Sequence, residues 1–265
     1  MITFYDIAAK EGVKPSPPTR GRFGELKLTI RSLNWELKFI HSYILNYKKL
    51  PYKTVAFEYP YLEPEFKKLG IPPSSKKPDG TPFYTSPSII DNETKTPVTD
   101  SYKITEYLDE TYPDTPRVIP KGSEALQAAF YDHFWQLMGP IFPILLPTAL
   151  DILNPVSAEY FDRTRSAYFG KPLKEMAPQG DERKEVWKKV EKSFETLDGW
   201  LNKSVGPFFM GNTITFADFT VAAMLQGIKV CMGENSQEWR DVMTWHNGRW
   251  KALLESLEPY ASTDN

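Results

Sequence analysis

Two adjacent residues, Asp100 and Ser101, have the types and the position to bind a small charged ligand. They precede a segment in which Ile104 and Leu108 recur at helical spacing, so the pair stands where a helix begins. The free amide groups at a helix N-terminus and the Ser101 hydroxyl can bind a carboxylate. The Asp100 carboxylate can pair with an amino group. A ligand that carries both groups can therefore bind at such a pair, although Asp-Ser before a helix is common and does not by itself indicate a site.

Cysteine and histidine offer little further chemistry in this sequence. The one cysteine, Cys231, excludes a disulfide within the chain and a four-cysteine zinc site. Cys231 lies in a late apolar run, where a buried structural thiol is expected. The histidines are far apart and show no metal-ligand spacing, so we expect no metal site; they are His41, His133 and His246.

The composition is that of a packed protein without a strong electrostatic field. Apolar residues make up 41% of the 265 residues, which is ample for a core. The formal net charge of −2 gives no field to attract nucleic acid or an anionic membrane. The most apolar stretch, "MGPIFPILLPTALDIL", is broken by prolines and is shorter than the roughly 20 residues of a bilayer span. The start, "MITFYDI", does not resemble a secretory signal, so we expect a cytoplasmic protein.

The first third of the sequence alternates strand and helix patterns. β-Branched and aromatic residues predict strands in "ITFYDI" (2–7) and "YKTVAFEY" (52–59). Between them, apolar residues at helical spacing predict a helix in "WELKFIHSYILNYKK". The short helix "EPEFKKLG", a hairpin of "YTSPSIID" with "TPVTD", and the helix after Asp100 complete the order. This is the thioredoxin-like α/β plan, a small mixed sheet with helices on both faces.

The rest of the sequence is helical almost throughout, after a proline-dense segment at 113–124. Apolar residues follow one helix face in "EALQAAFYDHFWQLM" and in "EVWKKVEKSFETLDGWL". In "FMGNTITFADFTVAAMLQGI", Thr215 and Asp218 form a capping-box-like pair, and the following residues predict a central buried helix. We therefore expect a thioredoxin-like domain in residues 1–114 and an all-helical domain in residues 122–265.

This order of domains resembles the glutathione transferases, on the stretches "YTSPSIID", "VTDSYKITEYL" and "GNTITFADF". The phrases "LNYKKLPYKT", "YLDETYPDTPR" and "GENSQEWRDVMTWHNGRW" are similar to the fungal etherase-type group, whose helical part matches the UstS-like family. The resemblance implies glutathione as co-substrate and a homodimer. It implies that Pro87 is cis and that Ser86 and Pro87 present backbone groups to the cysteinyl part of glutathione. It also implies that Asp100 and Ser101 hold the γ-glutamyl end.

The loop after the first strand departs from this family, because it carries an insert at about residues 16–34. Connections from strand to helix usually take about 2–6 residues. In the family this loop supplies a hydroxyl that stabilises the thiolate, and the resemblance implies Ser16 for that role. Two alternatives stay open: Ser32 or Asn34 caps the next helix, or Ser32 replaces Ser16 as the donor. A recent insertion and a retained intron would each account for the insert.

The second substrate is expected between the two domains, where pockets are common. Large aromatic side chains can form the wall of such a pocket, and the candidates are Phe134, Trp135, Phe142 and Trp245. The sequence thus predicts a transferase that uses glutathione thiolate on hydrophobic aromatic electrophiles, with aryl-ether cleavage as a further reaction. The alternative is a non-catalytic protein that binds glutathione or an aromatic ligand and has a disabled thiol-activation loop.

Overall fold

The computed structural model describes residues 1–10, 35–77 and 79–261 of the chain. A mixed four-stranded sheet of order β2-β1-β5-β6 forms the centre of the first part. Strand β1 pairs in parallel with β2 and antiparallel with β5, which in turn pairs antiparallel with β6. These strands are β1 (Ile2–Ile7), β2 (Tyr52–Phe57), β5 (Ser88–Asp91) and β6 (Thr96–Thr99), and a separate ribbon contains β3 (Ser75–Lys76) and β4 (Pro82–Phe83).

Strand β1 occupies the centre of the sheet because its residues suit burial on both faces. All six of its residues are buried, and β-branched and aromatic side chains pack well on a sheet covered from both sides. Parallel pairing of β1 with β2 needs a crossover connection, which includes helix α1 (Trp35–Tyr47).

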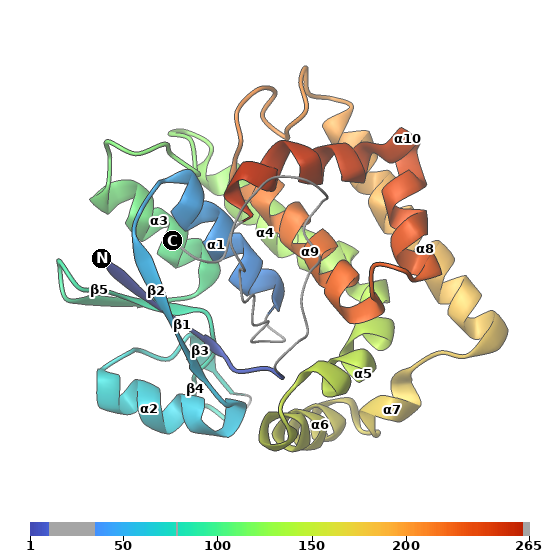
Figure 1. Cartoon of the computed structure of the whole chain (residues 1–265), viewed down its shortest axis with the longest axis horizontal. Helices are drawn as coiled ribbons and strands as arrows, with labels where there is room; N and C mark the ends of the chain where they lie inside the picture. Colours follow the sequence, from blue (N-terminus) through green and yellow to red (C-terminus); the bar gives the residue numbers. More distant parts are fainter. Residues whose placement is uncertain (11–34, 78, 262–265) are drawn as a thin grey trace.

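Two further helices complete the first part, α2 (Leu62–Leu69) and α3 (Ser101–Thr111). Figure 1 shows α1 and α3 on one side of the sheet and α2 on the other. The 3-10 turn η1 (Tyr59–Tyr61) leads into α2, which ends at Gly70 with a φ of 70° that favours glycine. The thioredoxin-like order of strands and helices predicted from the sequence is confirmed.

The second part of the described chain is helical (Figure 1). Its longest helix but one, α10 (Gln237–Leu257), is interrupted by non-helical backbone from Trp245 to Gly248, where His246 and Asn247 have φ of 53° and 59°. The elements described in this part are α-helices and 3-10 turns, which confirms the predicted all-helical part. The other helices are α4 (Glu124–Leu137), α5 (Phe142–Ile152), α6 (Pro155–Phe169), α7 (Leu173–Met176), α8 (Gly180–Leu201) and α9 (Phe216–Met232), with 3-10 turns η2 (Gly139–Ile141) and η3 (Glu258–Tyr260).

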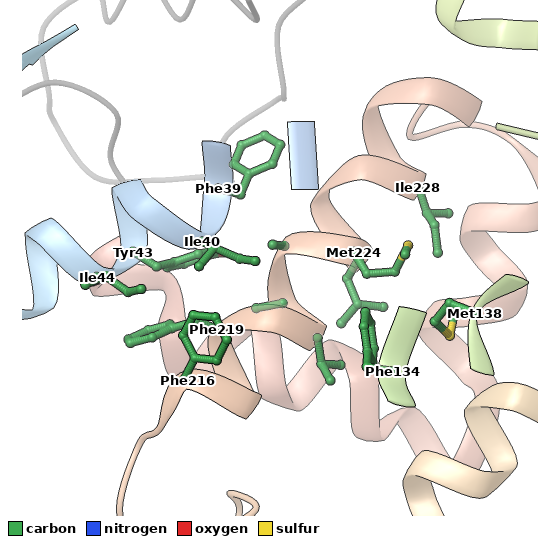
Figure 2. Close-up of a cluster of buried hydrophobic side chains, with 14 of the residues drawn as sticks. Phe39, Ile40, Tyr43, Ile44, Phe134, Met138, Phe216, Phe219, Met224 and Ile228 are labelled. Atoms are coloured by element: carbon green, nitrogen blue, oxygen red, sulfur yellow. The ribbon is translucent and has the colours of Figure 1, made fainter. Parts of the chain in front are cut away.

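Helix α9 lies in the hydrophobic core and joins the two parts of the molecule. The Thr215–Asp218 capping box begins it, and its first ten residues are all buried. Helix α1 packs against it, with the rings of Tyr43 and Phe219 stacked at 5.6 Å. Figure 2 shows the side chains of α1 and α9 meeting in one continuous cluster that also includes Phe134 of α4. Among the described helices, none is long and apolar enough to cross a bilayer.

A buried ion pair fixes the segment between the two parts. Lys48 Nζ donates a hydrogen bond to Asp109 Oδ1 at 2.7 Å, and both side chains are fully buried. The Asp109 carboxylate also accepts hydrogen bonds from the backbone amides of Val118 and Ile119. Burial lowers the pKa of Lys48, although the hydrogen bond to Asp109 opposes that shift. The pair holds the proline-dense segment against α3.

Candidate functional site

Asp100 caps the N-terminus of α3. Its Oδ1 accepts hydrogen bonds from the backbone amides of Tyr102 and Lys103, both at 3.1 Å, which is the usual geometry of an N-cap. Asp100 has φ 82° and ψ 131°, a conformation that costs a residue with a Cβ of order 1–3 kcal/mol. Such backbone strain is concentrated at functional sites in proteins.

Ser101, the first residue of α3, has a buried hydroxyl that the described residues leave unpaired. The residue is 2% exposed, and its Oγ makes no hydrogen bond within the described part of the chain. Leaving a buried hydroxyl unpaired costs about 1–3 kcal/mol. The Ser101 carbonyl, by contrast, accepts a hydrogen bond from Thr105 Oγ1 at 2.8 Å. The α3 N-terminus therefore holds one buried donor that the described chain leaves unpaired.

Pairing of β5 with β6 brings the Ser86–Pro87 turn to this helix terminus. The Ser86–Pro87 peptide bond is cis, as the resemblance implied. The register places Ser88 opposite Thr99, and Ser88 Oγ donates to Thr99 Oγ1 at 2.9 Å. Since Ser88 follows Pro87 and Thr99 precedes Asp100, the two halves of the predicted site lie next to each other.

The Ser86 side chain is held inside the sheet edge. Its hydroxyl donates to the Tyr5 carbonyl at 3.2 Å and lies 3.4 Å from Asp6 Oδ1. Ser86 is 1% exposed, so its hydroxyl has a structural role within the fold. The structure thus brings Ser86, Pro87, Asp100 and Ser101 together.

The acidic surroundings of the α3 N-terminus favour a cationic group. Burial, followed by the charges of Glu110 and Asp100, raises the pKa of the Glu106 carboxyl. Burial is the larger cause of this shift, the two carboxylates add to it, and the charge of Lys103 opposes it. An amino group next to Asp100 would pair with its carboxylate, and a helix N-terminus favours a carboxylate.

The predicted substrate aromatics fall into two separate groups. The rings of Trp135 and Phe142 lie 6.5 Å apart with planes tilted by 26°, and Phe134 packs edge-on behind Trp135 at 5.2 Å. Phe134 has no exposed surface, so it supports Trp135 and cannot itself contact a ligand in this conformation. Trp245 instead packs against Trp187 of α8, with ring centroids 5.3 Å apart.

The thiol-activation loop lies outside the described residues. Ser16, Ser32 and Asn34 all fall in the range 11–34, so their roles remain predictions. In the described part of the chain, no group of three or more His, Cys, Asp or Glu residues could hold a metal ion.

One contact between the two parts has no clear signal in the sequence. Glu58, at the end of β2, accepts hydrogen bonds from Asn154 Nδ2 at 2.6 Å and from the Ser157 hydroxyl. Ser157 Oγ in turn accepts from the backbone amide of Tyr59 at 2.9 Å. Asn154 precedes Pro155, a pair that does mark the start of α6 in the sequence. No residue pattern near Glu58 indicates that its side chain contacts the start of α6.

Next to this contact is a cavity of about 310 Å³ between η1, α2, β4 and α6. Its lining comes from segments about a hundred residues apart, which is why the sequence did not indicate it. The lining includes Tyr59, Glu63, Lys67, Phe83, Tyr84 and Tyr160.

Comparison with known sequences assigns the family. Residues 42–116 match the family described as glutathione S-transferase, N-terminal domain, and residues 125–260 match glutathione S-transferase, C-terminal domain. The chain is also 32% identical over 225 residues to the glutathione S-transferase-like protein ustS of Aspergillus flavus. The matched region covers 79% of this chain and 78% of that protein. The chain therefore belongs to the glutathione S-transferase family, and the predicted fold and enzyme class are confirmed.

Solved fungal structures resemble this one closely. The glutathione S-transferase CsGST63524 of Ceriporiopsis subvermispora, solved in complex with glutathione, has a TM-score of 0.87 and 34% identity over 100% of this chain and 99% of that chain. The glutathione transferase GSTFuA3 of Phanerochaete chrysosporium has a TM-score of 0.86 and 34% identity over 100% and 98% of the two chains.

Proposed function

We propose that the α3 N-terminus and the Ser86–Pro87 turn bind glutathione. Ser101 and the free α3 amides hold its α-carboxylate, Asp100 pairs with its α-amino group, and the backbone around Pro87 meets the cysteinyl part. The observation that carries this proposal is the buried Ser101 hydroxyl, which has no hydrogen-bond partner in the described chain. The complex of CsGST63524 with glutathione supports the choice of ligand.

The chemistry that we propose is attack by the glutathione thiolate. The thiol of glutathione has a pKa of about 8.5, so only a few per cent is ionised at neutral pH. Ser16 donates a hydrogen bond to the sulfur and favours the thiolate. Within the first part of the chain no cysteine is present, so the bound glutathione supplies the sulfur.

The proposed electrophile is a hydrophobic aromatic compound. Trp135 and Phe142 form a half-buried aromatic surface that supports this choice, with Phe134 behind Trp135, and Trp245 contributes from its separate cluster. In ether cleavage the thiolate attacks the carbon of an aryl ether. The carbon–sulfur bond forms, the carbon–oxygen bond breaks, and the aryloxide leaves and takes up a proton from water.

The domain roles, the oligomeric state, the location and the wider role belong to the same proposal. Residues 1–114 form the glutathione-binding domain and residues 122–265 the substrate domain. The protein works as a homodimer in the cytoplasm and takes part in detoxification. Light scattering on the purified chain at micromolar concentration gives the mass of the dimer if this assignment is right and the mass of one chain if it is wrong.

Turnover separates an enzyme from a binding protein. The full chain is incubated with glutathione and 1-chloro-2,4-dinitrobenzene, and separately with a β-aryl ether. We expect conjugate formation that Ser16→Ala lowers by about tenfold or more, while Ser75→Ala, an exposed serine of β3, leaves it unchanged. Calorimetric binding of glutathione without any turnover would favour the non-catalytic alternative. A version lacking residues 17–33 that gains turnover would identify the insert as the cause.

A further inference from the structure

The two parts of the molecule also meet at the carboxyl ends of β1 and β2. Three chain segments come together there: residues 8–10, which follow β1, residues 57–59, which follow β2, and residues 151–157, from the end of α5 to the first turn of α6. We call this meeting point the joint. Figure 1 shows the chain after β1 running toward the ends of α5 and α6.

Hydrogen bonds fix the chain after β1 against the end of α5. The Lys10 amide donates to the Ile152 carbonyl at 3.1 Å, and Ala9 forms an isolated antiparallel bridge with Leu153. The Lys10 side chain also donates to the Asp151 carbonyl at 2.9 Å. The second part of the molecule is therefore bonded to the chain within three residues of the end of β1.

The Glu58 carboxylate ties the end of β2 to the start of α6. One of its oxygens accepts a hydrogen bond from Asn154 Nδ2 at 2.6 Å, and the other accepts one from the buried Ser157 hydroxyl. Ser157 Oγ also accepts from the Tyr59 amide at 2.9 Å. Hydrogen bonds to an ionised acceptor are roughly twice as strong as neutral ones. The joint therefore depends on a charged side chain as well as on neutral backbone pairs.

Asn154 uses its side chain for this contact and not for its own helix. It is the N-cap residue of α6, and asparagine is a preferred N-cap because its side-chain oxygen can accept from the free amides of the first turn. In the described chain the Asn154 side chain makes no such bond, and its amide group donates to Glu58. The side chain therefore stabilises the contact between the two parts and not the start of α6.

The joint lies at the same end of the sheet as the proposed glutathione site. Strand β5 pairs antiparallel with β1, with Tyr5 opposite Ser88, and the Ser86 hydroxyl donates to the Tyr5 carbonyl. The Ser86–Pro87 turn is therefore within a few residues of the end of β1. In the other direction, α5 leads from the joint to Phe142, about 15 Å away along the helix axis. Helix α5 thus connects the joint to the proposed electrophile surface.

We propose that Glu58 is a positioning residue for the transfer step. Its hydrogen bonds hold the second part in one orientation against the first, so that an electrophile at Trp135 and Phe142 meets the sulfur of bound glutathione. The apolar contact of α1 with α9 is not directional, whereas hydrogen bonds are. A misplacement of about 1 Å between reacting groups can cost about 100-fold in rate. The effect on rate rests on the proposed function, whereas the effect on orientation does not.

The first test compares turnover with glutathione binding in the full chain. At saturating glutathione, Glu58→Ala should lower kcat with 1-chloro-2,4-dinitrobenzene by about tenfold. Its calorimetric dissociation constant for glutathione should stay within about twofold of the native value, because the proposed glutathione site lies in the first part. Glu58→Gln should restore most of kcat, since the amide oxygen can still accept from Asn154. Glu238→Ala is the matched control and should keep the native kcat, because Glu238 is a partly buried carboxylate that pairs with Arg183 inside the second part.

The second test measures the orientation of the two parts without turnover. Spin labels are attached through Lys76→Cys in β3 and Tyr168→Cys in α6, two exposed positions, in a chain that also carries Cys231→Ser. Pulsed electron paramagnetic resonance then gives the distribution of distances between the labels. Adding Glu58→Ala should widen this distribution, and adding Glu238→Ala should leave it unchanged.

A further variant keeps both tests valid if Glu58→Ala does not fold, which circular dichroism checks. Asn154→Ala removes only one of the two hydrogen bonds to Glu58, so it should lower kcat by about threefold and widen the distance distribution in the same way. An unchanged distribution in both variants would overturn the proposal. A wider distribution with native kcat, or an equal loss of kcat in Glu58→Ala and Glu238→Ala, would also overturn it. If the native chain shows no turnover, the proposed function fails, and the distance distributions alone decide the role of Glu58.

Discussion

Two helix N-termini in this protein use the same residue types and end up in opposite states. At α9, Thr215 and Asp218 form a capping box in which the Asp218 carboxylate accepts hydrogen bonds from the Thr215 amide, the Thr215 hydroxyl and the Phe209 amide. At α3, Asp100 caps the helix, but the neighbouring Ser101 hydroxyl stays buried and unpaired in the described chain. We call the α9 terminus closed because its capping groups are paired with one another. We call the α3 terminus open because the Ser101 hydroxyl has no partner among the described residues.

The difference shows how a helix start can serve either stability or binding. A closed terminus satisfies its donors internally and has nothing to offer a ligand. An open terminus gives up the hydrogen bond of a buried hydroxyl and accepts a positive φ at Asp100, both of which disfavour folding. That cost is recovered only when a ligand binds. We therefore expect changes at α9 to affect stability and changes at α3 to affect binding.

The largest effect is expected at the closed terminus. Asp218→Ala leaves the Phe209 and Thr215 amides without acceptors in a buried position, so the free energy of unfolding should fall by about 2–4 kcal/mol. Chemical denaturation measures this loss. Asp181→Ala is the control, because Asp181 lies in the first turn of α8 and is 94% exposed. An equal, small loss in both variants would contradict the closed terminus.

The closed terminus should also give stability a distinct pH dependence. Burial raises the pKa of Asp218 to about 6, and hydrogen bonds from Phe209 and Thr215 only partly oppose this. Between the ordinary value of 3.8 and about 6, the folded chain keeps a proton that the unfolded chain has lost. The free energy of unfolding therefore falls by ~1.4 kcal/mol per pH unit in that window as pH rises. Asp218→Asn should lose this slope in denaturation series at several pH values, and an unchanged slope would show that Asp218 does not cause it.

At the open terminus, removing the Asp100 cap should lower the free energy of unfolding by less than Asp218→Ala does. Asp100→Ala loses the hydrogen bonds from the Tyr102 and Lys103 amides and keeps a Cβ at positive φ, so stability should fall by about 1 kcal/mol. Asp100→Gly removes the Cβ as well and should cost close to nothing. Thermal unfolding of both variants measures the difference. A larger loss for glycine than for alanine would argue against backbone strain at this position.

The smallest expected change in the free energy of unfolding is an increase. Ser101→Ala removes a buried hydroxyl that has no partner among the described residues, so it should raise the free energy of unfolding by about 0.5–1 kcal/mol. Thr105→Ala is the matched control on the same helix, because it removes a satisfied buried hydroxyl that donates to the Ser101 carbonyl. It should lower stability by about 1 kcal/mol. Equal destabilisation by both variants would mean that Ser101 is satisfied in solution.

Much of the fold could be predicted because it depends on local patterns. The strand at 2–7 and the central helix after Thr215 follow from β-branched and apolar runs and from a capping box, and each signal lies within a few residues. The adjacency of Pro87 and Asp100 could be predicted only through the family resemblance. Physically it depends on the register of β5 with β6, which two short strands specify weakly from sequence.

The features that could not be predicted depend on contacts between distant segments. The cavity needs Tyr59 and Tyr160 to stack across the junction, and no pattern in either segment indicates its partner. Trp245 is a candidate for the substrate pocket, and its sequence context did not indicate that the non-helical backbone from Trp245 to Gly248 places its ring against Trp187. Gly248 indicates a break in the helix, although the sequence does not predict the direction in which the chain turns at that break.

The most direct test of the open terminus is the calorimetric titration of glutathione into the native chain, Ser101→Ala and Thr105→Ala. Loss of a hydrogen bond to a charged group costs about 1–3 kcal/mol, so Ser101→Ala should bind roughly tenfold more weakly. Thr105→Ala should bind within about twofold of the native chain, because in the described residues Thr105 Oγ1 donates to the Ser101 carbonyl of the same helix. Equal affinities for Ser101→Ala and the native chain would contradict the account and remove Ser101 from the glutathione site.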